Sequence, residues 1–150
     1  MVISEIIAPT NNNRKQDSKT KMNATRIFSS ADFLQPSDGE PVRSVVTESV
    51  HATVVAWYVK PGQAIGAHLH PHGQDTWTIL AGEGAYVLDD AGTTTAIAAG
   101  DVVVAPIGCV HGVLNTGELP LVFISVVSTD AGYQPVPLTH GMQAVDVAQV

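Results

Sequence analysis

The feature that most constrains the fold of this chain is a regular succession of short β-prone runs that starts at Phe28. Runs rich in Val, Ile, Thr and aromatic residues alternate with Gly or Pro about every eight to twelve residues, which is typical of an all-β sandwich or barrel. The only helical signal is a turn near Ser30–Leu34, which Ser29 or Ser30 could cap. The predicted strands are 42–48, 50–59, 65–70, 75–81, 84–88, 93–98, 101–105, 110–115 and 120–128.

Two phrases with fixed spacing hold four of the six histidines. The first phrase is Gly62-x5-His68-Leu69-His70-x4-Asp75-x6-Gly82. The second phrase is Gly100-x5-Pro106-Ile107-Gly108-x2-His111-x3-Asn115. The histidines of the first phrase share one face of a strand, whereas the third imidazole comes from a distant strand. These side chains can converge only if the barrel closes.

Together the two phrases resemble the two signature motifs of the cupin superfamily, with Asp75 where the family usually has Glu. The resemblance covers about residues 42–128 and implies a single-barrel cupin of the RmlC-like or germin-like kind. The implied fold is all-β, a cupin β-barrel also described as a double-stranded β-helix or jelly roll. The resemblance further implies three histidines and one carboxylate around a metal ion inside the barrel.

Strand parity favours Asp75 as the fourth metal ligand. Asp75 shares a strand face with Trp77 and Ile79, and this more apolar face should point into the barrel. Gln74 lies on the other face and is the alternative ligand, because a bulge at Gly73 would reverse the parity. Asp is one methylene shorter than Glu, so its carboxylate could instead act through a water or orient a histidine.

The predicted site therefore has two groups of residues. The predicted metal ligands are His68, His70, His111 and Asp75, with Gln74 as the alternative carbonyl ligand. The predicted catalytic residues, as a base or a proton relay, are Asp75 and His72. Imidazole and carboxylate ligands suit a divalent transition metal, namely Fe, Mn, Ni, Cu or Zn, whereas Mg and Ca prefer sites made only of oxygen atoms.

The chain has the length of one domain and an uneven distribution of charge. We expect a flexible N-terminal arm over 1–23, a barrel domain over 24–135 and a C-terminal tail over 136–150, with Met22 as an alternative start of translation. The arm is basic, whereas only Arg43 and Lys60 carry positive charge after residue 26. The formal net charge of -7 argues against nucleic acid as a partner.

Other features indicate the compartment and the oligomeric state. Cys109 is the only cysteine, so an intrachain disulfide is excluded and a cytoplasmic location fits. No apolar run approaches the roughly 20 residues needed to span a bilayer, so no membrane association is expected. Exposed edge strands are stabilised when their backbone groups pair with another strand, which favours a homodimer. The C-terminal tail is a candidate for the contact between the two copies.

The shortage of positive charge narrows the expected ligand. A pocket for a polyanion needs Arg or Lys, and only Arg43 and the metal are available. We expect a neutral or singly anionic small organic molecule that binds the metal through an oxygen. The leading hypothesis is a metalloenzyme, with a dioxygenase favoured and an isomerase, lyase or cyclase also open. The alternative is a non-catalytic cupin that binds a small molecule, with a structural or ligand-holding metal.

Overall fold

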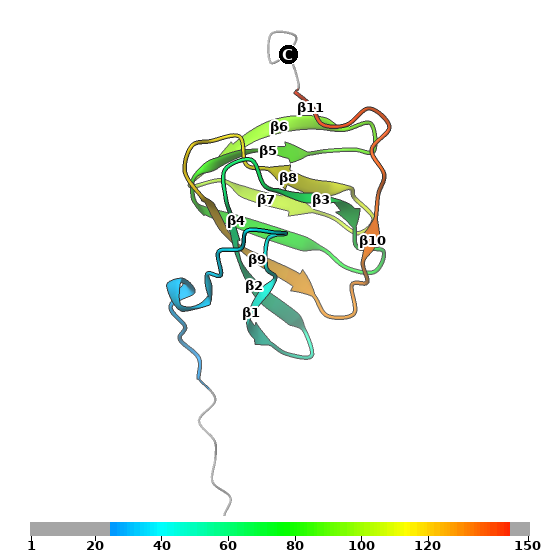
Figure 1. Cartoon of the computed structure of the whole chain (residues 1–150). Helices are drawn as coiled ribbons and strands as arrows, with labels where there is room; N and C mark the ends of the chain where they lie inside the picture. Colours follow the sequence, from blue (N-terminus) through cyan, green and yellow to red (C-terminus); the bar gives the residue numbers. More distant parts are fainter. Residues whose placement is uncertain (1–24, 145–150) are drawn as a thin grey trace, which may run out of the picture.

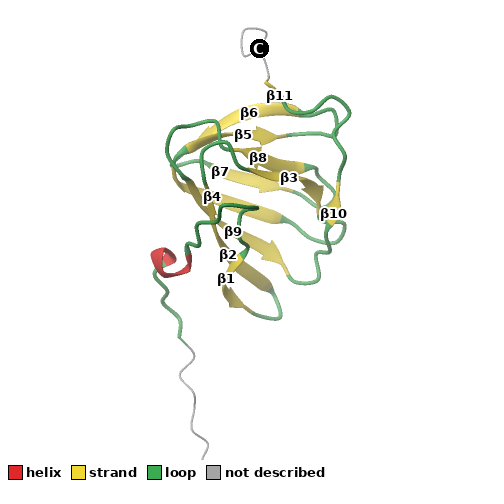
Figure 2. Cartoon of the chain, in the orientation of Figure 1, coloured by secondary structure: helices red, strands yellow, loops and turns green. Residues whose placement is uncertain are grey.

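The computed structural model describes residues 25–144, and these residues form two facing β-sheets (Figures 1 and 2). The expected all-β jelly roll is confirmed. The elements in chain order are η1 (Ser30–Phe33), β1 (Ser44–Glu48), β2 (Ala52–Val59), β3 (Ala64–Leu69), β4 (Asp75–Ala81), β5 (Glu83–Val87), β6 (Thr93–Ala98), β7 (Val102–Ala105), β8 (His111–Leu114), β9 (Leu121–Ser128), β10 (Gln134–Pro135) and β11 (Gln143–Ala144).

The chain passes repeatedly from one sheet to the other. The first sheet has the strand order β1-β2-β9-β4-β7, and the second has the order β10-β3-β8-β5-β6-β11. Neighbouring strands are antiparallel, except that β11 runs parallel to β6. Because β3 and β8 are neighbours in one sheet and β4 lies in the other, the histidines of the two phrases lie side by side and face Asp75 across the interior.

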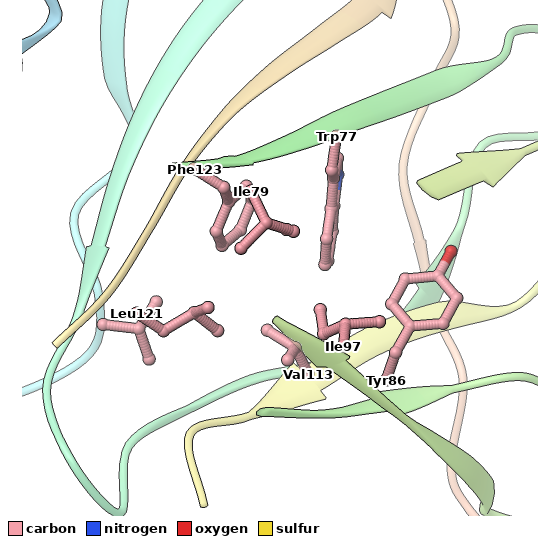
Figure 3. Packing of buried hydrophobic residues seen from close by; sticks show 8 residues of the cluster. Trp77, Ile79, Tyr86, Ile97, Val113, Leu121 and Phe123 are labelled. Atoms are coloured by element: carbon pink, nitrogen blue, oxygen red, sulfur yellow. The ribbon is translucent and has the colours of Figure 1, made fainter. Parts of the chain in front are cut away.

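The apolar core fills one part of the space between the sheets (Figure 3). The ring of Trp77 stands between Phe123 and Tyr86, stacked on the first with centroids 4.4 Å apart and edge-on to the second at 5.4 Å. Asp75 precedes Trp77 by two residues on β4 and therefore faces the same interior. The interior is thus apolar around Trp77 and becomes polar towards the start of β4.

The two ends of the chain are only partly described. The expected arm over 1–23 and the alternative start at Met22 lie outside the described residues, as do the last residues of the expected tail, 145–150. Residues 136–144 of that tail follow β10 and end in β11, which adds to the edge of the second sheet. The predicted turn near Ser30 is η1, but the side chain of Ser29 makes no capping hydrogen bond, and the backbone N–H of Asp32 bonds to its carbonyl instead.

Candidate metal centre

Two opposed sheets bring together His68, His70, Asp75 and His111. One ligand atom from each residue lies within 4.8 Å of the ligand atoms of the other three. His68 and His111 are direct cross-strand partners on β3 and β8, His70 follows the end of β3, and Asp75 begins β4. Of the predicted site residues, these four form one cluster.

A β-bulge turns His68 towards the interior. Ile65 pairs with Val113 and His68 pairs with His111, so β3 uses one residue more than β8 between the two pairs. Strict alternation would place residues three apart on opposite faces of a strand. Because of the bulge, Ile65 packs against the core and His68 still faces His111.

All three imidazoles are held by backbone carbonyls at Nδ1. His68 Nδ1 lies 2.8 Å from Gly66 O, His70 Nδ1 lies 2.6 Å from Gly132 O, and His111 Nδ1 lies 3.0 Å from Cys109 O. A carbonyl oxygen can only accept, so each Nδ1 carries the hydrogen and donates it. The neutral tautomer then leaves Nε2 with a free lone pair, which is the usual arrangement of a metal-ligating histidine.

The carboxylate of Asp75 reaches the centre and is fixed from behind. Its Oδ2 lies 3.3 Å from His111 Nε2 and 3.5 Å from His70 Nε2. Ser125 donates its hydroxyl hydrogen to Oδ1 at 2.6 Å, and Trp77 donates its indole N–H to Oδ2 at 2.9 Å. Asp75 is thus held as an acceptor, in the position that the parity of β4 predicts.

The electrostatics favour the ligand forms of Asp75 and His68, but not that of His70. Burial raises the pKa of Asp75, but the hydrogen bonds with His111, His70, Ser125 and Trp77 together outweigh burial and hold this pKa below its usual range. Burial, followed by the charge of His111, lowers the pKa of His68 to about 4. The hydrogen bond with Asp75 is the main cause of the raised pKa of His70. A carboxylate and a neutral imidazole are the protonation states that bind a metal.

The spacing of the ligand atoms fits a transition metal ion. Two neighbouring ligands bound at about 2.0–2.2 Å lie roughly 2.8–3.1 Å apart in octahedral geometry and roughly 3.3–3.6 Å apart in tetrahedral geometry. The two separations between Asp75 Oδ2 and the histidine Nε2 atoms, 3.3 and 3.5 Å, fall in the tetrahedral range. The four residues could therefore hold one divalent ion, and their nitrogen and oxygen atoms suit the first-row transition metals.

A cavity of about 430 Å³ adjoins the centre. Trp57, Ile65 and Val55 line it with apolar surface, and His68, His70 and Asp75 form its floor at the centre. Among the described residues that line the cavity, Arg43 is the only lysine or arginine. A ligand in this cavity would contact the metal-binding side chains and an apolar wall at the same time.

The loop between β9 and β10 forms another wall of the cavity. The ring of Tyr133 stacks on that of His68 with centroids 5.0 Å apart, although Tyr133 is 64% exposed. Gly132 supplies the carbonyl that holds His70, and Ala131 accepts the backbone N–H of His72 at 2.9 Å. The sequence of this loop has no pattern that marks it as part of a site, and only the fold places it beside β3.

Two of the predicted site residues lie outside the cluster. The side chain of Gln74 is exposed and donates its amide N–H to Thr76 Oγ1 at 3.1 Å. His72 is exposed and is not among the residues that line the cavity. β3 ends at Leu69, and the turn at Pro71 and His72 breaks the alternation that would have kept His72 on the face of His68.

Comparisons with known proteins agree with this architecture. Residues 55–127 match the family model of the cupin domain. A solved structure from Klebsiella pneumoniae, of an uncharacterized conserved protein with a double-stranded β-helix domain, is 47% identical to this chain. The alignment has a TM-score of 0.73 and covers 75% of this chain and 97% of that one.

The curated relatives match over shorter stretches. The oxalate-binding protein of Thermotoga maritima is 39% identical over 67 residues, which are 45% of this chain and 54% of that protein. Mannose-1-phosphate guanylyltransferase 2 of Escherichia coli O157:H7 is 32% identical over 72 residues, which are 48% of this chain and 14% of the enzyme. The described part of this chain contains no helix that is long and apolar enough to cross a membrane.

Proposed function

This chain belongs to the cupin superfamily, and we propose that its centre binds a divalent transition metal ion that acts on a neutral or singly anionic small organic molecule. The observation that most supports the proposal is the orientation of the imidazoles. All three contact a backbone carbonyl through Nδ1, so Nε2 is the nitrogen that remains for a metal, close to a buried carboxylate.

The residues of the centre would act as metal ligands or would position a ligand. His68, His70, His111 and Asp75 would hold the ion, and Ser125 would keep Asp75 in place. A divalent transition metal bound there would supply Lewis acidity and a site for an oxygen ligand. The lowered pKa of Asp75 makes it a weak base, so we propose that it serves mainly as a ligand.

The cavity supports an organic substrate with an apolar body. Trp57 and Ile65 would exclude water from one side of the substrate, and the loop that carries Tyr133 would cover another. Among the possible enzyme classes we favour a dioxygenase. An isomerase, a lyase or a cyclase would also fit the proposed centre. Both protomers of the proposed homodimer would carry a complete centre, because one chain supplies all four side chains.

A non-catalytic binding protein is the second candidate. The likeness to a protein named for binding oxalate supports it, although that relative is matched over about half of its length. In this case the metal would hold the ligand or stabilise the barrel, and no turnover would occur.

Metal content tests the centre itself. We expect His68→Ala and His111→Ala to purify folded, as judged by circular dichroism, and to lose most of the metal that the wild-type protein keeps after dialysis, measured by inductively coupled plasma mass spectrometry. His140→Ala is the matched control, because His140 is exposed and lies outside the cluster. Full metal content in both folded cluster variants would contradict the proposal.

Nitric oxide separates the two candidate functions. After anaerobic loading with Fe(II), an electron paramagnetic resonance signal of the iron–nitrosyl species is expected if the ion has an open coordination position. A protein that binds Fe(II) but gives no such signal has a saturated ion, which supports the binding protein and contradicts the dioxygenase.

A further inference from the structure

Arg43 is an uncommitted positive charge at the cavity. It immediately precedes β1, and within residues 25–144 no other lysine or arginine lines the cavity. Within the described residues, no carboxylate lies within salt-bridge distance of its guanidinium group, whereas Lys60 pairs with Asp38. An exposed arginine beside a cavity, without an acidic partner of its own, is available to a ligand.

Arg43 and the metal centre line the same cavity. The lining includes the guanidinium-bearing Arg43 together with His68, His70 and Asp75. A molecule that occupies the cavity can reach both at once.

The remaining charges of the lining limit the ligand to one negative charge. Glu48 and Asp130 also line the cavity, and Glu48 accepts the hydroxyl hydrogen of Thr53 at 3.3 Å. These two carboxylates would repel a second negative charge on the ligand. The rest of the lining includes Val55, Trp57 and Ile65, which suit an apolar body.

We propose that Arg43 binds the carboxylate of a singly charged organic acid, whose hydroxyl or carbonyl oxygen at the other end reaches the metal centre. This inference rests on the proposed function and narrows its substrate class from neutral or singly anionic molecules to monocarboxylates. Arginine recognises a carboxylate through two parallel N–H···O bonds, so it would fix the orientation of the substrate as well as its charge. Arg43 is therefore assigned as a specificity-determining residue.

Matched acids and amides test the assignment. Glycolate, 3-hydroxybutyrate and 4-hydroxybenzoate, and the neutral amide of each, are titrated into Co(II)-loaded protein by isothermal calorimetry. We expect at least one acid to bind about 10- to 100-fold tighter than its amide to the wild-type protein, as for a charge-assisted hydrogen bond. Arg43→Gln should abolish this preference, and Arg43→Lys should keep part of it.

Lys60→Gln is the control for net charge. It removes a cation that pairs with Asp38 and does not line the cavity, so the preference for the acid should survive. The assignment would be overturned if the wild-type protein showed no preference for the acid over the amide. It would also be overturned if Arg43→Gln kept this preference or if Lys60→Gln lost it equally. Malate, which adds a second carboxylate to a hydroxy acid, should bind no tighter than 3-hydroxybutyrate, and tighter binding would overturn the limit of one charge.

Cobalt content, measured on the same samples, distinguishes the two proposals. A wild-type protein that takes up no Co(II) contradicts the proposed metal centre and the assignment that rests on it. A Co(II)-loaded protein without any preference for an acid contradicts only the role of Arg43.

Discussion

Asp75 is a shorter carboxylate than the glutamate usual in this family, and the structure shows how it can still reach the centre. Its strand pairs with β9 so that Trp77 is opposite Ser125. From these two neighbours, the hydroxyl of Ser125 and the indole of Trp77 reach back to the two oxygens of the carboxylate. Because both hydrogen bonds come from buried side chains, the carboxylate is held at a fixed distance from His70 and His111.

Asp75→Asn tests the carboxylate as a ligand. The amide has nearly the same shape but no charge, so we expect the affinity for Co(II) or Zn(II) to fall by about 100-fold, at the upper end of the range for changes around a metal site. Ser125→Ala frees the carboxylate without removing it and should lower the affinity by about 10-fold. Competition with a chromophoric chelator measures both effects.

Gln74→Ala is the control for Asp75→Asn and tests the alternative ligand. The exposed side chain of Gln74 bonds to Thr76, so its removal should leave the metal affinity unchanged. If Gln74→Ala lost much of its metal affinity and Asp75→Asn kept that of the wild-type protein, Gln74 and not Asp75 would be the metal ligand.

The spacing of the two motifs predicts that His68, His70, Asp75 and His111 lie together, but it does not exclude Gln74 and His72, and it does not show what surrounds the cluster. Ser125 lies 50 residues from Asp75, and Gly132 lies 62 residues from His70. Neither has a residue type or a local pattern that marks it as part of a site. Such partners are set by the register of β9 and by the path of the following loop, which only the folded chain defines.

At the scale of elements, the turn and strand pattern predicted the barrel well. The predicted strands 75–81 and 93–98 have the bounds of β4 and β6. β10 and β11 were missed because two residues are too few for a hydrophobic period, and only their pairing with β3 and β6 makes them strands. The bulge in β3 could not be predicted from the sequence either, because it depends on the register of the pairing with β8.

Gly73 couples the turn after β3 to the loop after β9. A Cβ at this position would lie 2.5 Å from the Cβ of Ala131 and 2.8 Å from that of Ser128. Gly73→Ala must therefore displace the loop that carries Gly132 and Tyr133, which hold His70 and His68. We expect a loss of about 1–3 kcal/mol in the free energy of unfolding, as for other overpacked sites, and weaker metal binding.

Gly66→Ala is the matched control for Gly73→Ala. A Cβ at Gly66 would meet no atom within 4 Å, so the stability and the metal affinity should stay close to those of the wild-type protein. Urea unfolding and metal titration of both variants measure the difference. If Gly73→Ala binds metal as tightly as Gly66→Ala does, the loop does not position the imidazoles.

Metal binding should also stabilise the barrel, because the proposed ligands belong to both sheets. His68 and His111 lie in the second sheet and Asp75 in the first, so an ion at the centre would link the two layers. An ion at 100 times its dissociation constant adds about 2.7 kcal/mol to the free energy of unfolding, or roughly 10 °C in Tm for a domain of this size. Differential scanning fluorimetry before and after chelation checks this, and an unchanged Tm would contradict a metal that joins the sheets.

At the scale of the whole molecule, the outer face of the first sheet carries no charged residue over β4, β7 and β9. The outward positions of these strands carry only Val, Ile, Leu, Ala, Thr and Ser. Val102 is 63% and Val104 49% exposed, and Leu80 and Val126 are also exposed beside them. Because the barrel region is strongly acidic, an uncharged face is where two copies of the chain could approach without repulsion.

The proposed homodimer should therefore form through this face rather than through the tail. Val104→Asp places a charge among the exposed apolar side chains of β4, β7 and β9, so we expect sedimentation at micromolar concentration to shift from dimer to monomer while the metal content stays unchanged. Thr95→Asp, at an exposed position of β6 in the other sheet, is the matched control and should remain a dimer.

A wild-type protein that sediments as a monomer would refute the dimer. If Val104→Asp remains a dimer, the interface does not lie on this face. Loss of the dimer with full metal content would also show that the centre is complete within one chain, as its four side chains indicate.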